Sequence, residues 1–409
     1  MHSESIATCS AISSHCREEA MTDPTGRSFL SYRRLRQEEA ALLIAAQHDH
    51  GIPTWQDVQN LSSGPTEDEI RRILADPSTA SAVLFLTPEV EESPIIRNVE
   101  VPKIIQRAEA ANGFFVVPLA AGGLDYSKAA GVTSNHLSAQ NLADWNMHKV
   151  QDATLTPDHA AEIAHRVLVQ RMQAIHRHLP QATPLRVGLF VRRAPAFELG
   201  NALVFNWFHR FIGKEATADT WRNTLLPALS RVADAIRQHA SGREVEAFGI
   251  PTLPAALALG CAFLSTSALR ASWRQVTPGH PDQIWTLAAA REDSGFKPQI
   301  ISKDPKARDI GVLVSVADNT EPVFAAYQRQ LLFPLRALVH VTKPAPYPHL
   351  VRSPGQATDL ALTVQDGIRT ARREYGNVGT IHLFMAAPAG RKMSSRVRQS
   401  VSEICEPLS

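Results

Sequence analysis

One stretch of the sequence, residues 81–109, limits the possible folds more than any other. It opens with the apolar run AVLFL at 82–86, which is too short for a globular helix and typical of a strand buried on both faces. Ser93 and Pro94 then start a helix, because serine is a good N-cap and proline at the first helical position loses no hydrogen bond. The stretch therefore predicts a strand followed by a helix, the repeating unit of an α/β fold.

The helix that follows Pro94 carries a carboxylate, Glu100, one turn beyond Ile96 and close to its apolar face. Pro102 removes a backbone donor just after it, so we expect a kink there. A carboxylate near the carboxyl end of a buried strand stands where active sites of open α/β sheets form. Glu100 is therefore the candidate catalytic residue. The alternative interpretation is an ordinary solvated or salt-bridged glutamate.

Two segments upstream complete a larger pattern. Residues 28–34 read SFLSYRR, a strand that ends in a basic pair. Residues 55–64 read WQDVQNLSSG and span the end of a second short strand at 52–58 and the loop that follows it. With the third strand, its Thr-Pro and the glutamate helix, these segments resemble a TIR domain over about residues 28–179. One position departs from the family pattern. A tryptophan often stands four residues before the family's glutamate, and in this chain that position is Ile96.

The resemblance implies a flavodoxin-like TIR domain at residues 28–180 that hydrolyses NAD+ at the bond between nicotinamide and ribose. Glu100 would then stabilise the cationic ribose, with NAD+ as the substrate and with no metal or cofactor. The expected substrate-binding residues are Arg33 and Arg34 on the pyrophosphate, together with Tyr32, Trp55 and Asp57. A solvated surface pair is the alternative for the two arginines, and a turn-forming residue is the alternative for Asp57.

Length and composition bound the remaining possibilities. The 409 residues predict two or three domains, and a net charge of +2 gives no global field for holding a long nucleic acid. Four cysteines without a CxxC pair favour a reduced, cytoplasmic protein without a zinc site or disulfide framework. No apolar run approaches the roughly 20 residues that span a bilayer. The polar residues 1–27 are expected to be a disordered leader, with Met21 as an alternative start.

A second alternating region follows a short linker at 181–184. Strand patterns at 185–191, 244–250 and 284–288 are followed by a restart at 309–316, a strand at 335–341 and a helix at 357–375. This weak duplication predicts two Rossmann-like halves, at about 185–300 and 308–390, and gives the whole chain an α/β fold class.

The second region resembles the SAVED domain, a fused pair of CARF-like folds that senses cyclic oligonucleotides in bacterial anti-phage signalling. The residues that carry the likeness are 187–191, 248–260, 310–316 and the segment IHLFMAAPA at 381–389. The resemblance places a SAVED domain at 185–390. Its expected ligand-binding residues face a cleft between the halves; they are Arg192, Arg193, Thr252, Ser315, Asp318 and Pro388. The arginines could equally be surface residues.

The last residues depart from that family. Where an apolar final helix is expected, residues 391–398 read RKMSSRVR, and residues 391–409 form an atypical polar tail. The leading hypothesis is an NAD+ hydrolase effector of anti-phage defence, in which a cyclic oligonucleotide, cyclic tri-adenylate in the first instance, drives assembly into a homo-oligomer or filament and activates the TIR domains. The alternatives are a non-catalytic TIR adaptor, and a ligand-sensing scaffold whose C-terminus is truncated.

Overall fold

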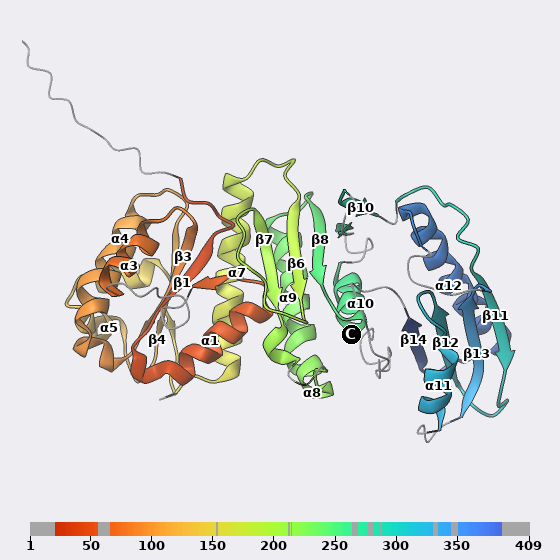
Figure 1. Ribbon diagram of the computed structural model, residues 1–409. Helices are drawn as coiled ribbons and strands as arrows, with labels where there is room; N and C mark the ends of the chain where they lie inside the picture. Colours follow the sequence, from red (N-terminus) through yellow and green to blue (C-terminus); the bar gives the residue numbers. More distant parts are fainter. Residues whose placement is uncertain are drawn as a thin grey trace, which may run out of the picture.

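Three β-sheets with helices packed on them follow one another along the molecule (Figure 1). The computed structural model describes residues 21–55, 66–152, 154–211, 213, 215–263, 269–276, 281–286, 288–329, 334–344 and 351–386. The three sheets appear in chain order, so each is built from its own continuous part of the sequence.

The first sheet contains the strand on which the sequence analysis began. That strand, β3 (Thr79–Leu86), is buried along its whole length at the centre of the order β2-β1-β3-β4-β5. Its strands are parallel, as the alternation of strand and helix predicts. The other elements of this unit are β1 (Arg27–Ser31), η1 (Arg34–Arg36), α1 (Gln37–Asp49), β2 (Thr54–Trp55), α3 (Thr66–Ala75), η2 (Pro88–Glu92), η3 (Ile96–Glu100), α4 (Val101–Glu109), β4 (Phe115–Ala120), α5 (Tyr126–Val132), α6 (Ala139–Asp144), β5 (His148–Lys149) and α7 (Pro157–His178).

The second sheet has the order β10-β9-β8-β6-β7 and the third has the order β11-β13-β12-β14. Three of their strands, β7, β9 and β11, were not expected from the sequence. The second unit comprises β6 (Leu185–Phe190), β7 (Asn201–Asn206), η4 (Phe208–Arg210), α8 (Ala218–Thr220), η5 (Trp221–Leu225), α9 (Leu226–His239), β8 (Glu244–Ile250), α10 (Leu253–Ala262), β9 (Arg270–Gln275) and β10 (Gln283–Trp285). The third comprises β11 (Lys297–Ser302), β12 (Asp309–Ser315), α11 (Glu321–Gln328), β13 (Leu335–Thr342), α12 (Pro354–Tyr375) and β14 (Ile381–Ala386).

All three sheets share one parallel three-strand core. In each, the first of the three parallel strands lies in the middle, the second pairs on one side of it and the third on the other: β2-β1-β3, β7-β6-β8 and β13-β12-β14. In the third sheet the antiparallel strand β11 precedes these three in the chain and pairs with β13. The first sheet thus has the flavodoxin-like order, and the second and third are a pair of Rossmann-like halves, as the duplicated pattern predicts. In such sheets the strand order reverses beside the first strand, and ligands bind outside the carboxyl ends at that point.

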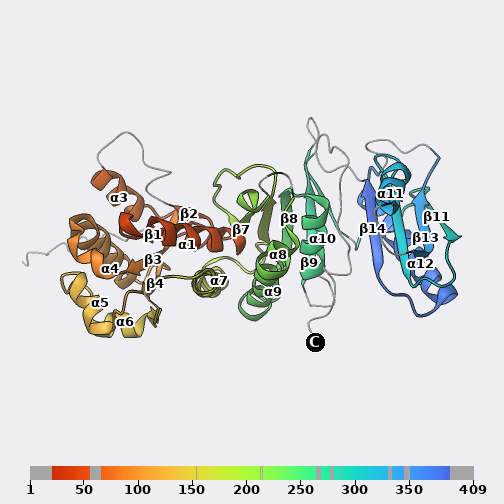
Figure 2. The same ribbon diagram turned by 90° about the horizontal axis from the view of Figure 1, so that it is seen from below.

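The first two sheets, which lie on either side of the predicted linker at 181–184, share a hydrophobic core. Helices α1 and α7 lie between them (Figures 1 and 2), and one hydrophobic cluster runs from the first sheet through these helices into the second. The clusters of the third sheet, by contrast, consist only of residues from 296 onward. The first and second units therefore share a core, and the third sheet has cores of its own.

A fully buried arginine, Arg171 of α7, holds this junction together. Its guanidinium donates to the carbonyl oxygens of Thr25 (2.7 Å) and Gly26 (2.6 Å) before β1, and to that of Ala202 (2.8 Å) in β7. Burial lowers the pKa of Arg171 to about 10. The prediction of a disordered leader is therefore wrong for residues 21–27. These residues are packed into the fold by the hydrogen bonds from Arg171 to Thr25 and Gly26, and by the hydrogen bond from Arg107 to Thr22 (2.8 Å).

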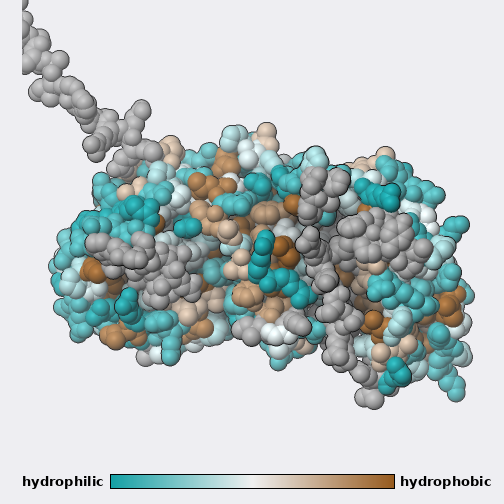
Figure 3. Space-filling view, viewed as in Figure 1, coloured by the Kyte–Doolittle hydropathy of each residue, from teal (hydrophilic) through white to brown (hydrophobic). Residues whose placement is uncertain are grey.

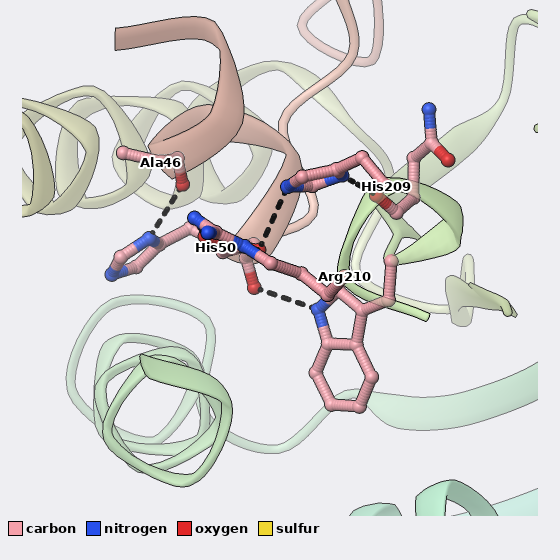
Figure 4. Close-up of polar contacts among 7 residues, drawn as sticks. Ala46, His50, His209 and Arg210 are labelled. Atoms are coloured by element: carbon pink, nitrogen blue, oxygen red, sulfur yellow. Dashed lines mark hydrogen bonds and ion pairs between the residues drawn. The ribbon is translucent and has the colours of Figure 1, made fainter. Parts of the chain in front are cut away.

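A second set of contacts joins the carboxyl end of α1 to the segment after β7 (Figure 4). The buried carboxylate of Asp49 accepts two hydrogen bonds from Arg210, at 3.1 and 2.6 Å, and the backbone carbonyl of Asp49 accepts from the indole of Trp207 at 3.3 Å. Burial raises the pKa of Asp49, and its bonds to Arg210 oppose that rise. The carboxylate of Asp49 is almost fully buried, so removing Arg210 would leave a buried charge without its partner, at a high cost in free energy.

The predicted linker at 181–184 is also held in place by hydrogen bonds. Arg243, just before β8, donates to the carbonyl oxygens of Leu179 (2.6 Å), Pro180 (2.6 Å) and Thr183 (3.0 Å). These groups lie at and just beyond the end of α7, where backbone carbonyls lack helical partners. The segment around 181–184 is therefore a tightly bound turn between two units that share a core.

We expect the junction to weaken in acid through His50. This side chain is 3% exposed, its Nδ1–H donates to the carbonyl of Ala46 at 2.8 Å (Figure 4), and burial lowers its pKa from 6.5 to about 4. The unfolded chain takes up the proton more readily, so stability is lost as the pH falls from about 6.5 towards 4. Between pH 7 and pH 5 this one group accounts for about 2 kcal/mol.

The measurement is the free energy of unfolding of wild type and His50→Gln at both pH values. The variant should lose about 2 kcal/mol less than wild type on acidification. His176→Gln, on the exposed end of α7, is the matched control and should behave as wild type. An equal loss in wild type and His50→Gln would contradict the assignment.

Candidate functional site

The first candidate site lies at the carboxyl edge of the first sheet, where the strand order reverses between β1 and β3. Arg33 and Arg34 follow β1, and the short helix η2 follows β3. Arg33 is half-buried and 4.0 Å from Glu92 of η2, whereas Arg34 is exposed. The predicted arginines are thus at the predicted edge, with one of them already facing an acid from the neighbouring strand's loop.

A third arginine at this edge, Arg36, was missed by the sequence analysis. It contacts Glu39 at 2.9 Å and Glu89 at 2.7 Å, and so ties α1 to η2. Burial is the largest influence on the pKa of Glu89 and would raise it, but hydrogen bonds from Arg36, Thr87 and its own backbone amide, together with the charge of Arg36, outweigh burial and hold that pKa below its usual value. The spacing RRLR at 33–36 was the only available signal, and it does not distinguish a site arginine from a surface one.

Glu100 is 6% exposed and ends the π-helix η3, on the face of the sheet covered by α4. Pro102, which lacks a backbone donor, follows at the start of α4, and its missing hydrogen bond explains the widened turn. The same arrangement recurs at η5, which precedes Pro227, so the wide turn needs no ligand to account for it. What the structure adds is burial, which argues against the solvated form of the alternative interpretation and leaves a salt-bridged glutamate as the alternative to a catalytic one.

Two predicted substrate-binding residues are core residues instead. Trp55 was expected in a loop, but it ends β2, is fully buried and stacks on Phe29 with 5.1 Å between ring centroids. Tyr32 packs with α1 and α7 on the face of the sheet opposite to α4, so the structure does not bring it to the face of Glu100. Both side chains contribute buried apolar area, which is the commoner use of an aromatic side chain beside a sheet. Asp57 lies outside the described residues.

The second candidate site is the equivalent edge of the second sheet. Arg192 and Arg193 follow β6 and are exposed, and Thr252 follows β8 as the N-cap of α10. The two strand ends are adjacent, because the amide of Val191 donates to the carbonyl of Ile250 at 3.3 Å. Three of the residues predicted to bind a cyclic nucleotide are therefore neighbours at one reversal of strand order.

The third sheet offers a different edge. Ser315, predicted to face the ligand, is fully buried; its hydroxyl lies 3.0 Å from Nε2 of His340 and 2.8 Å from the hydroxyl of Thr320. That prediction is wrong, because these contacts occupy the hydroxyl within the fold. Asp318 is exposed, and its carboxylate accepts from the amide of Asn319 at 2.8 Å. Pro388 lies outside the described residues.

His340 was missed by the sequence analysis because it lies within the apolar run of β13. Its Nδ1 is 3.3 Å from a carboxylate oxygen of Glu321 in α11, so it links that helix to Ser315. Ser315, His340 and Glu321 contact one another in the order found in a catalytic triad. The Ser315 hydroxyl is fully buried, however, so it cannot reach a substrate. The chain of contacts secures the loop between β12 and α11.

Other features of the described residues do not point to a site. None of their His, Cys, Asp and Glu side chains gather in a group of three or more that could hold a metal ion. No helix within these residues is both long enough and apolar enough to cross a membrane. Two surface hollows, of about 280 and 390 Å³, lie away from all three carboxyl edges, near Trp145 and near His239.

Comparison with known proteins identifies the second part of the chain. Residues 228–392 match the family described as SAVED, the SMODS-associated and fused to various effectors sensor domain. The match begins inside α9, although the sheet that α9 covers starts with β6. No curated protein matches the chain.

Solved structures of similar arrangement are distant in sequence. Two are of the Acinetobacter baumannii Cap4 SAVED/CARF-domain containing receptor, one with the cyclic trinucleotide 2′3′3′-cAAA and one with 3′3′3′-cAAA. Both are 12% identical, with TM-scores of 0.38 and 0.40, and both alignments cover 88% of this chain and 92% of the receptor. A Moraxella osloensis Cap4 receptor gives 12% identity and a TM-score of 0.36 over the same shares. No residue correspondence follows at these values.

Proposed function

We propose that this chain, which carries a SAVED sensor domain at residues 228–392, is a cytoplasmic effector of bacterial anti-phage defence that is switched on by a cyclic oligonucleotide. The family match is the observation that carries the proposal, because a sensor domain fused to an effector requires a second functional unit. The α/β unit at residues 21–178 is that unit in our proposal, and its flavodoxin-like sheet is consistent with a nucleotide substrate.

The sensor would bind cyclic tri-adenylate or a related ring at the edge of the second sheet. Phosphates require cations or backbone N–H groups, and bases require flat surfaces. Arg192 and Arg193 supply cations after β6, and the start of α10 supplies backbone donors beside them. The chain's net charge of +2 means that such local groups, rather than a global field, must hold the ligand.

The effector unit would hydrolyse NAD+ at the bond between nicotinamide and ribose. In this proposal Glu100 lies against the ribose and stabilises the positive charge that develops as nicotinamide leaves, and water then completes the reaction. Its burial at the start of α4 supports the role, since a carboxylate acts more strongly on a nearby charge when water is excluded. Arg33 and Arg34 would bind the pyrophosphate.

Activation is proposed to proceed through assembly of several copies, so that the toxic reaction is off in the monomer. The effector unit exposes an apolar side chain beside its candidate site, since Leu35 is 71% exposed next to Arg34. Leu199 and Phe208, on either side of β7, are also exposed, and apolar residues gather over the middle of the face in Figure 3. Such surfaces are suited to contacts between copies.

A non-catalytic scaffold is the second candidate function. The ion pairs of Arg33 with Glu92 and of Arg36 with Glu89 favour it, because they occupy the edge where a pyrophosphate would bind. In that case the sensor would still recognise its ligand and assemble, and the first unit would only recruit partners.

The test is to incubate the purified full chain with NAD+, with and without a panel of cyclic dinucleotides and trinucleotides, while following nicotinamide release and particle size. The effector predicts that one ring raises both together. Assembly without nicotinamide release would support the scaffold, and the absence of any binding or assembly with every ring would contradict the sensor.

A further inference from the structure

The outer edge of β7 is held by the first unit. β7 is the last strand in the order of the second sheet, and β6 pairs with its inner side. On the outer side the amide of Gly200 donates to the hydroxyl of Thr25 at 2.8 Å, and the amide of Val204 donates to the carbonyl of Gly51 at 2.7 Å. Arg171 donates to the carbonyl between them. The first unit therefore satisfies the polar groups that an edge strand otherwise leaves open.

Two kinds of contact thus resist movement of the first unit against the second. Separating them would open the hydrophobic cluster that they share and would leave buried polar groups without partners. Units of one chain move relative to one another by default, unless the interface between them is large and hydrophobic. This interface is hydrophobic, and its buried arginine and the pair of Asp49 with Arg210 add directional bonds. We expect the two units to keep one orientation.

The segment just before β11 is attached to the third unit. The buried carboxylate of Asp359, in α12, accepts a hydrogen bond from the amide of Ser294 at 2.9 Å. It also accepts from the side chains of Ser294 and Arg291. In the first turn of the same helix, the carbonyl of Gly355 accepts from the amide of Glu292 at 3.3 Å. The chain therefore belongs to the third unit from Arg291 onward.

Between β10 and that segment the chain crosses from the second unit to the third. β10 ends at Trp285 and pairs with β9, so it is part of the second sheet. After it, the amides of Ala288 and Ala289 donate to Thr286, each at 3.2 Å, which are contacts within the crossing itself. Within the described residues, the hydrophobic clusters of the third sheet take no side chain from the second unit. A few residues at the end of an element are the usual place of a hinge.

We infer that the described chain forms two rigid bodies rather than three, one from residue 21 to Trp285 and one from Arg291 to Ala386, and that a bound ligand changes the orientation of the second body against the first. The part concerning the ligand rests on the proposed function, which supplies the cyclic oligonucleotide. The candidate site at Glu100 then keeps a fixed position relative to the strand end at Arg192. The ring acts on the first unit only through what the reoriented body or another copy brings to it.

Urea unfolding of the full chain, followed by tryptophan emission and by far-UV circular dichroism, tests the division into two bodies. All six tryptophans lie between residues 55 and 285, so their emission reports the first body, with Trp55 in one of its units and Trp207 in the other. We expect one emission step for wild type, shifted to lower urea by roughly 1 M in Arg171→Met. Asp359→Asn should leave that step unchanged and lower the midpoint of the remaining dichroism change. Asp366→Asn, exposed on the same helix, is its control and should shift neither.

Two results of the unfolding experiment would contradict the division. Two emission steps, of which Arg171→Met shifts only one, would mean that the first and second units are separate bodies. An emission step that Asp359→Asn lowers as far as Arg171→Met does would mean that all three units form one body.

Hydrogen–deuterium exchange of the full chain, with and without cyclic tri-adenylate, tests the movement. The ring should change exchange severalfold in peptides that cover residues 283–296 and leave unchanged the peptides that contain the amides of Gly200 and Val204. An equal change at those two amides, or a bound ring without any change at 283–296, would overturn the movement. If wild type binds no ring of the dinucleotide and trinucleotide panel, the proposed function fails and the ligand-driven movement with it, whereas the unfolding steps decide the two bodies without a ligand.

Discussion

Replacing Glu100 with glutamine is expected to lower ligand-stimulated nicotinamide release by a factor on the order of 10² to 10³, the usual cost of removing a group that stabilises charge in a transition state. Glutamine keeps the shape of the buried side chain and removes only its negative charge, which is the property that the cationic ribose requires. Because the sensor edge is untouched, binding of the cyclic oligonucleotide and the change in particle size should persist.

The matched control for this prediction is Glu109→Gln, an exposed carboxylate at the end of α4, the helix that continues directly from η3. It should release nicotinamide at the wild-type rate. If Glu100→Gln is as active as this control, Glu100 is not the acid that stabilises the ribose. If neither wild type nor either variant releases nicotinamide although the chain assembles, the scaffold becomes the better account of the first unit.

Replacing Arg171 with methionine is expected to lower the free energy of unfolding by about 3 kcal/mol or more. The guanidinium is fully buried and serves three carbonyl oxygens, two before β1 and one in β7. Methionine fills a similar volume but donates nothing, and a buried acceptor left unpaired costs about 1–3 kcal/mol. The loss falls on the junction between the first and second units, so proteolysis should begin near residues 21–27.

Denaturant unfolding of the full chain measures this effect. Arg177→Met, about one and two-thirds turns further along α7 and exposed, is the matched control and should unfold close to wild type. Arg171→Lys should recover only part of the loss, because an ammonium group cannot reproduce the planar fork of a guanidinium. Equal stability of Arg171→Met and wild type would mean that the two units are held together by apolar packing alone.

Several parts of the fold could be predicted from the sequence because they depend on local patterns. The run AVLFL marked β3, Ser93-Pro94 and Pro102 marked a helix start and a disturbed turn, and the restart at 309–316 marked a second Rossmann-like half. The basic pairs at 33–34 and 192–193 could be placed at strand ends for the same reason. Strand periodicity and turn residues are properties of neighbours in the chain, so a sequence records them directly.

The tertiary structure alone decided which side chains are available for chemistry. Trp55, Tyr32 and Ser315 each stand at the end of a strand, yet packing from distant elements buries them, while Thr252 keeps an unused hydroxyl in the corresponding place. In the sequence Arg171 is one of three arginines on an amphipathic helix, and only the approach of β7 and residues 25–26 makes it the link between two units. A sequence specifies the residue and its local element, but the partners of a buried polar group come from parts of the chain that are remote in sequence, and those partners fix its role.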